Sequence, residues 1–177
     1  DQMREAFPYN IGCGPQDPCD MVVFSRHRFQ DVEVVPFFSF PGRLVVARLE
    51  LEAGPITMIA AHLTKPYYGD WHDRQLERLA ELLDRIEGPL VLAGDFNSQP
   101  FVRAFRRVLL ERSGLRLASR MQQTWPALGL SGSRYAGFAI DHVLVRGEVS
   151  PVSVELIEDP IGSNHRGFLS HFDLNGQ

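Results

Sequence analysis

Residues 90–93, with the sequence LVLA, constrain the fold of this chain more than any other stretch. A short apolar run between a proline and a glycine predicts a buried strand. Asp95 and Asn97 follow at alternate positions, which would place a carboxylate and an amide on the same side of an extended segment. Ser98 then predicts a helix N-cap and Pro100 an early helical residue. The same residues also suit an ordinary strand-to-helix turn, where Asp and Asn bond the local backbone.

Three further segments have the same form, a strand that ends in a polar cluster. They are residues 60–64 (AAHLT), 139–144 (AIDHVL) and 162–166 (GSNHR). The four motifs together resemble the endonuclease/exonuclease/phosphatase superfamily, which includes DNase I-like nucleases, abasic-site endonucleases, inositol-polyphosphate phosphatases and bacterial sphingomyelinases. Its ordered motifs are a strand that ends in His-Leu, then Gly-Asp-Phe/Leu-Asn, Ile-Asp-His/Tyr and, near the C-terminus, Ser-Asp-His. All four occur here in that order, with Asn164 where the family usually has Asp, and the resemblance covers most of the chain from about Asp20 onward.

The resemblance implies a four-layer α/β/β/α sandwich of the DNase I-like type, in the α/β (α+β) class. A hairpin followed by alternating strands and helices also favours one mixed α/β domain over two, so residues 1–177 are expected to form a single domain. The family's first strands, and the Glu that is its principal metal ligand, precede everything that matches here, and Glu5 does not fit that position. We therefore expect the C-terminal two-thirds or so of a full domain, which should bind metal poorly by itself.

The resemblance also implies roles for the polar residues. Asp95 would orient and deprotonate the attacking water, and Asn97 would donate its amide to a phosphate oxygen. His62 would donate to a non-bridging oxygen, although a lone His at a strand end is more often structural. Asp141 would hold His165 in one tautomer opposite the phosphate. Phosphate-ester hydrolysis needs such a set because positioning and electrostatics supply most of the catalysis.

A hard divalent ion, Mg²⁺ or Mn²⁺, is the cofactor that the resemblance implies, with ligands from Asp95 and Asn164. Asn164 keeps one oxygen but lacks the charge of the family's Asp, so metal affinity should fall or a different ion should be used. Trp125, in a segment that resembles part of the family's cleft, would stack on a substrate; the simpler reading is a half-buried core residue. His142 should point to the opposite face from Asp141 and be structural. The other histidines, His27, His72 and His171, carry no functional prediction.

Hydrophobic periodicity predicts the remaining elements. Apolar residues at helical spacing predict a helix over residues 71–87, with Asp70 as its N-cap and a Gly-Pro pair after its end. A second helix is expected over 100–111, while residues 1–19 suit the end of a helix followed by a loop. Gly54 and Pro55 predict a turn. Strands are expected at 21–26, 32–35, 44–51, 56–62, 138–145 and 165–174.

Charge and composition leave the substrate open. The net charge of −4 and the single lysine, Lys65, argue mildly against tight sequence-independent DNA binding, which depends on many phosphate contacts. The phosphate ester could belong to a nucleic acid, a phospholipid or a small phosphodiester, and no obligate protein partner is evident. No apolar run approaches the ~20 residues of a membrane span. Cys13 and Cys19 could form a disulfide or remain two cytosolic thiols; we favour the disulfide and an extracytoplasmic domain, anchored to a membrane in its parent.

These observations lead to two functional hypotheses and one reading without function. The leading hypothesis is divalent-metal-dependent hydrolysis of a phosphate ester by an activated water, as in a phosphodiesterase, nuclease or phosphatase. The alternative is a catalytically degenerate member that binds a phosphorylated ligand or partner without turnover, because of Asn164 and the missing Glu. The third reading, turn chemistry on an unrelated α/β fold, would leave the four motifs far apart in space.

Overall fold

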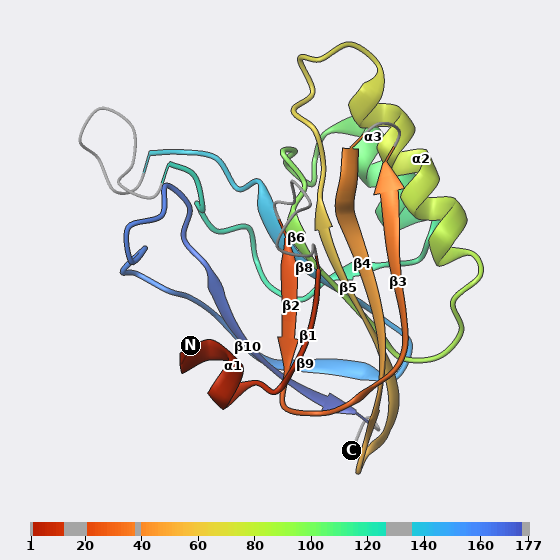
Figure 1. Cartoon of the computed structure of the whole chain (residues 1–177). Helices are drawn as coiled ribbons and strands as arrows, with labels where there is room; N and C mark the ends of the chain where they lie inside the picture. Colours follow the sequence, from red (N-terminus) through yellow and green to blue (C-terminus); the bar gives the residue numbers. More distant parts are fainter. Residues whose placement is uncertain (1, 13–20, 38–39, 127–135, 175–177) are drawn as a thin grey trace.

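A six-stranded mixed sheet lies at the centre of the computed structural model, which describes residues 2–12, 21–37, 40–126 and 136–174 (Figure 1). The strand order is β3-β4-β5-β6-β8-β7. The strands are β3 (Phe29–Phe37), β4 (Phe40–Leu51), β5 (Gly54–His62), β6 (Leu90–Asp95), β7 (Arg116–Leu117) and β8 (Asp141–Arg146). β5 and β6 are parallel, and the other neighbouring pairs are antiparallel. A crossover therefore has to connect β5 to β6.

α2 makes this crossover, and the helices together cover one face of the sheet (Figure 1). α2 (Trp71–Leu83) follows β5, and α3 (Arg103–Phe105) continues into the π-helical segment η1 (Arg106–Arg112) after β6. One face of α2 is buried, because its apolar residues recur at helical spacing: Leu76, Leu79, Ala80 and Leu83. This face packs against the sheet together with Phe96 and Phe105, whose rings meet edge to face at 5.3 Å.

A smaller layer of strands covers the opposite face. β9 (Val149–Leu156) and β10 (Phe168–Leu174) form an antiparallel pair, and β1 (Tyr9–Gly12) pairs with β2 (Val22–Ser25). The short helix α1 (Gln2–Ala6) precedes β1. Val149 of β9 and the rings of Phe168 and Phe172 of β10 pack against β6 and β8 in a second apolar cluster. The central sheet is thus buried on both of its faces at β6 and β8.

Burial on both faces explains the continuous apolar run of β6. Leu90 and Leu92 point into the cluster beneath the helices, while Val91 belongs to the cluster beneath β9 and β10. In β8 the same alternation places Leu144 in the cluster beneath the helices and Val143 in the cluster beneath β9 and β10. A strand between two cores has no polar face, so it lacks the alternation of a half-exposed strand.

The predicted fold class is confirmed, because the structure is mixed α/β with a central multi-stranded sheet. Most predicted strands exist with shifted bounds. The predicted turn at Gly54–Pro55 is wrong, because the turn lies at residues 52–53 and Pro55 pairs with Glu50 inside the β4–β5 ladder. β1 and β9 were not predicted as strands: β1 falls where residues 1–19 suggested a loop, and β9 interrupts its apolar pattern with Pro151.

The predicted helices differ from the observed ones mainly at their ends. α2 ends at Leu83 rather than at residue 87, and Asp70 occupies its N-cap position without a side-chain capping bond, because its carboxylate pairs with Arg74 instead. Ser98 is not an N-cap and Pro100 is not helical. The chain turns at residues 99–102 first, so Val102 precedes α3.

No helix among the described residues is long and apolar enough to cross a membrane. Cys13 and Cys19, for which a disulfide was expected, lie outside the described residues.

Candidate active site

Three polar side chains form one row across the central sheet. His62 of β5 is opposite Asp95 of β6, and Asp95 is in turn opposite Asp141 of β8. Residues paired across neighbouring strands place their side chains on the same face of a sheet. The Nε2 atom of His62 lies 3.7 Å from Oδ2 of Asp95. The register of the sheet thus brings three of the predicted residues together at one end of β5, β6 and β8.

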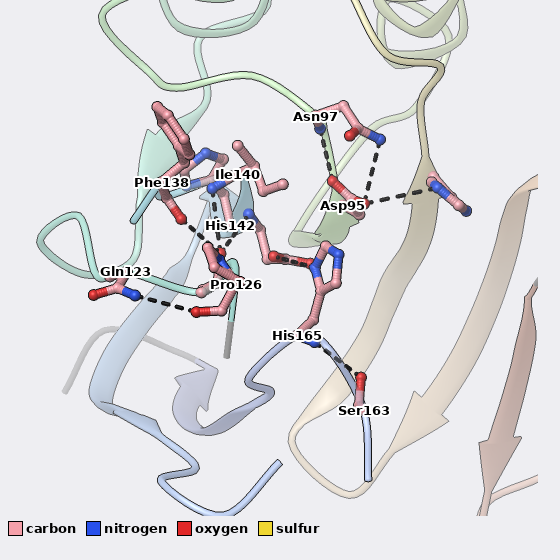
Figure 2. A network of polar contacts seen from close by, with 12 residues as sticks. Asp95, Asn97, Gln123, Pro126, Phe138, Ile140, His142, Ser163 and His165 are labelled. Atoms are coloured by element: carbon pink, nitrogen blue, oxygen red, sulfur yellow. Dashed lines mark hydrogen bonds and ion pairs between the residues drawn. The ribbon is translucent and has the colours of Figure 1, made fainter. Parts of the chain in front are cut away.

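His165 joins this row from a loop rather than from a strand. The predicted strand at 165–174 begins only at Phe168, and the Ser163 hydroxyl accepts the backbone N–H of His165 at 3.0 Å. Nδ1 of His165 lies 2.9 Å from Oδ2 of Asp141, so Nδ1–H donates to the carboxylate (Figure 2). The expected Asp141–His165 pair is formed, and this bond fixes the orientation of the imidazole ring.

Two effects oppose the ionisation of Asp95. Burial, the larger effect, and the negative charge of Asp141 raise the pKa of Asp95 above its ordinary value of 3.8. The backbone N–H of Asn97 and the charges of His62 and His165 act in the opposite direction without cancelling this rise. Asp95 is therefore a stronger base than an exposed aspartate and has more to gain from a nearby cation.

Asn97 reaches the site through a turn and not through strand alternation. β6 ends at Asp95, and Asn97 has a φ of 48°, in the left-handed region. Its backbone N–H donates to Oδ1 of Asp95 at 2.7 Å, and its side-chain Nδ2 donates to the Leu63 carbonyl at 2.8 Å. The two side chains lie together as expected, but the extended geometry given as the reason was wrong (Figure 2). Donation from Nδ2 to a phosphate oxygen would have to replace a bond that this amide makes to the protein.

Thr124 belongs to the site although no motif singled it out. Its side chain is fully buried, and its hydroxyl oxygen lies 3.2 Å from the backbone nitrogens of Ile140 and Asp141, whose N–H groups it accepts. The Thr124 carbonyl accepts the backbone N–H of Arg166 at 2.9 Å. Thr124 thus ties the start of β8 to the loop that carries His165. Its position directly before Trp125 is the signal that could have identified it.

Trp125 and Asn164 lie beside the row. The half-buried ring of Trp125 stacks on Phe138 and its centroid is 6.5 Å from that of His165, so it borders the site. Packing against Phe138 is observed, and stacking on a substrate stays a prediction. Asn164 precedes His165 with an exposed side chain, and its role as a metal ligand also stays a prediction.

His142 packs behind the site, on the opposite face of β8 from Asp141. Its buried ring contacts Phe96 and Phe105, and Nε2 lies 2.9 Å from the Ser98 carbonyl oxygen. Burial lowers the pKa of His142, opposed mainly by its bonds to backbone carbonyls and by the charge of Asp141. The ring is therefore held as a neutral donor, which agrees with the structural role expected for it.

Asp95, Asp141 and His165 can converge on one cation. Each offers a ligand atom, and these atoms all lie within 4.8 Å of one another. Two carboxylates and an imidazole at this spacing suit a small divalent ion. A cation would also relieve the repulsion that raises the pKa of Asp95. Asp141 and His165 thus lie beside Asp95 as further candidate ligands, while the role expected for Asn164 stays a prediction.

Solved structures share this fold. An endonuclease/exonuclease/phosphatase from Beutenbergia cavernae is 23% identical with a TM-score of 0.68, and the alignment covers 87% of this chain but 47% of that one. The corresponding protein from Bacteroides vulgatus is 16% identical with a TM-score of 0.72, covering 97% of this chain and 79% of that one. TDP2 from D. rerio, solved with a single-strand DNA product, is 15% identical with a TM-score of 0.69, covering 86% and 71%.

This chain therefore spans about half the length of the Beutenbergia protein. A comparison with curated proteins found no match. The sequence model of the Endonuclease/Exonuclease/phosphatase family matches residues 3–165, which include all four motifs and all the residues of the row. With the motifs assembled at one end of the sheet, and with a family match over most of its length, the chain belongs to the endonuclease/exonuclease/phosphatase family.

Proposed function

We propose that this protein hydrolyses a phosphate ester with an activated water and a divalent cation. The observation that carries the proposal is the row of His62, Asp95 and Asp141 across three strands, completed by His165. This set combines a carboxylate base with imidazole donors around a single position, which is what attack on a phosphorus atom requires. Membership of a family of phosphoesterases and nucleases supports the same reaction.

Asp95 is the proposed base for the attacking water. Its place in the row, between His62 and Asp141, supports this role, because a general base must lie within reach of the water it deprotonates. The bond from the Asn97 backbone to Oδ1, at 2.7 Å, holds the carboxylate in one rotamer. Asp95 thus takes the proton of the water while the phosphate is held by other groups.

His62 and the Asp141–His165 pair are the proposed phosphate contacts. His62 is one-third exposed and lies on the far side of Asp95 from Asp141, so the two imidazoles flank the carboxylate. The Nδ1–H bond to Asp141 keeps the His165 ring oriented. Each imidazole donates to a phosphate oxygen, which stabilises the negative charge that develops during attack.

A divalent cation, Mg²⁺ or Mn²⁺, is the proposed cofactor. Asp95 and Asp141 are the carboxylates that would hold it, with Asn164 as the neighbouring amide oxygen. When bound, such an ion polarises the phosphate and stabilises the leaving oxygen. The protein's own contribution is to hold the carboxylates of Asp95 and Asp141 side by side. Their mutual repulsion is relieved when a cation or a proton binds.

The substrate class is also part of the proposal. TDP2 of D. rerio was solved with a single-strand DNA product, so a short nucleic acid is a reasonable first substrate for this chain. A phospholipid and a small phosphodiester serve as the other two test substrates, because the site grips a phosphate group that all three share.

Turnover of bis-p-nitrophenyl phosphate, single-stranded DNA and a phospholipid with Mg²⁺ or Mn²⁺ tests the proposal. We expect wild-type protein to hydrolyse at least one of them, and Asp95→Asn and His165→Ala to lose about 10²- to 10⁴-fold in kcat. Asp173→Asn, which removes an exposed carboxylate of β10, is the matched control and should keep full activity. Full turnover in Asp95→Asn and His165→Ala would show that the roles are wrong.

A second candidate is a member of the family that binds phosphorylated ligands without turnover. The exposed amide of Asn164, in place of the usual carboxylate, favours this reading because it removes a negative charge from the metal ligands. Calorimetric titration separates the two candidates. Binding of Mg²⁺ or Mn²⁺ supports the hydrolase, whereas phosphate-ester binding without any metal binding supports the degenerate member.

A further inference from the structure

The first two turns of α2 bury two polar side chains that take no part in the proposed reaction. His72 is 3% exposed and Gln75 is fully buried, on the face that otherwise packs leucines against the sheet. Burying a polar group is unfavourable unless hydrogen bonds compensate. The partners of these two side chains therefore indicate what the helix holds in place.

His72 holds the loop that follows β6. Its Nε2 lies 2.9 Å from the carbonyl oxygen of Phe96, and because a carbonyl only accepts, Nε2–H is the donor. From the β8 side, His142 makes the same bond to the carbonyl of Ser98, also at 2.9 Å. Two buried imidazoles thus donate hydrogen bonds to the backbone carbonyls on either side of Asn97.

Gln75 holds the loop that follows β5. Its Oε1 accepts the backbone N–H of Thr64 at 2.7 Å and the Thr64 hydroxyl at 3.0 Å. Thr64 is two residues after His62, and the intervening Leu63 carbonyl accepts Nδ2 of Asn97. The loops after β5 and β6 are therefore bonded to each other and, through separate side chains, to α2.

This arrangement matters most at Asn97. A non-glycine residue at a φ of 48° is strained, and such strain persists only where the surroundings fix the backbone. The carbonyls on both sides of Asn97 are the groups that His72 and His142 bind. Without them, the turn could relax and carry the Asn97 N–H away from Asp95.

We propose that His72, Gln75 and His142 are positioning residues, which fix from behind the loops that follow His62 and Asp95, the second of which carries Asn97. The proposal rests on the proposed function for its catalytic consequence, but not for its structural one. His72 and Gln75 lie on one helix and clamp different loops, so each should control a different part of the site. Misplacement of reacting groups by about 1 Å lowers turnover on the order of 10²-fold.

Kinetics of four variants test the catalytic consequence. His72→Leu and Gln75→Leu should lower kcat about 10²-fold with little change in KM. His72→Gln keeps a donor near the position of Nε2 and should recover most of the lost turnover. Leu83→Ala, at the other end of α2, is the matched control: it should lower thermal stability while kcat stays unchanged. Equal losses of kcat in Leu83→Ala and His72→Leu would overturn the proposal.

Amide hydrogen exchange without substrate or metal tests the structural consequence. His72→Leu should speed exchange at Asn97, and Gln75→Leu should speed exchange at Thr64, with β6 amides unchanged in both. If one variant does not fold, the other still tests the one-to-one correspondence. Unchanged exchange at both loop amides would overturn the inference. If wild-type protein hydrolyses no phosphate ester, the proposed function fails while this measurement still decides the positioning role.

Discussion

The Asp95 carboxylate is half-buried and lies opposite Asp141, and both features disfavour its negative charge. Because the pKa of Asp95 is raised in the folded protein, the folded state holds its proton more tightly than the unfolded state does. Its contribution to stability is complete below the unfolded value near 3.8 and is lost as the pH rises through the folded pKa. Asp95 therefore destabilises the metal-free protein at neutral pH.

Asp95→Asn should consequently be more stable than wild-type protein at pH 7 while losing the proposed activity. The amide keeps an oxygen for the Asn97 N–H but cannot ionise, so the stability difference should shrink as the pH falls toward 4. Urea unfolding at several pH values measures it, with Asp173→Asn as control. A variant less stable than wild type at pH 7 would contradict the assigned electrostatics.

Asp141→Asn tests the orientation of His165. The variant removes the carboxylate that accepts Nδ1–H at 2.9 Å, so the ring should lose its fixed orientation. We expect kcat for phosphate-ester hydrolysis to fall on the order of 10²-fold. Steady-state kinetics with saturating Mn²⁺, which separate this effect from weakened metal binding, provide the check; an unchanged kcat would argue against the pair.

At this scale the motifs predicted which side chains meet, because His62 ends β5, Asp95 ends β6 and Asp141 begins β8 at the same end of one sheet. His165 reaches them from a loop. The motifs could not predict the backbone conformation of Asn97. Its φ of 48° depends on buried hydrogen bonds from two imidazoles to the carbonyls of Phe96 and Ser98. Thr124 was missed because its bonds join backbone groups far apart in the sequence.

At the scale of elements, β5 and β6 approach each other closely at Gly94. A Cβ atom there would overlap the carbonyl oxygen of Ala61, and the φ of 151° is one that side chains rarely adopt. Gly94→Ala should therefore push the strands apart one residue before Asp95 and destabilise the protein by about 3 kcal/mol or more. It should also abolish the alignment of Asp95 with His62.

Gly88→Ala is the matched control for this prediction. Gly88 has a φ of 80°, but a Cβ atom at this position would have no neighbour within 4 Å, so only backbone strain of about 1 kcal/mol should result. Denaturant unfolding of both variants measures the difference. Equal losses of stability would mean that strand contact at Gly94 does not govern the spacing of β5 and β6.

Hydrophobic periodicity predicted the helices and strands whose residues are buried at regular intervals. It did not predict elements whose secondary structure is set by tertiary contacts. The run at β6 and the leucines of α2 each face a core at regular intervals. β9 was missed because its exposed face and Pro151 break the alternation, whereas its pairing with β10 and its packing on β8 fix it as a strand. The helix start at Arg103 depends on the turn before it, which no single residue encodes.

Over the whole molecule, metal binding and folding should be coupled. An ion held by Asp95 and Asp141 would bind the folded chain only, so free ion at 100 times Kd should add about 2.7 kcal/mol to the free energy of unfolding. Thermal unfolding with increasing Mn²⁺ measures this gain. It should diminish at acidic pH, where Asp95 holds a proton, and in Asp95→Asn. A gain that is identical in Asp95→Asn would place the ion elsewhere.

The central claim is that this row of residues directs a water to a phosphorus atom. Hydrolysis of bis-p-nitrophenyl phosphate with Mg²⁺ or Mn²⁺ in ¹⁸O-labelled water tests it most directly, with mass analysis of both products. Our account predicts one labelled oxygen in the phosphate product of each turnover, with the labelled product forming about 10²- to 10⁴-fold more slowly after Asp95→Asn. Label in the p-nitrophenol, or turnover that is indifferent to Asp95, would contradict it.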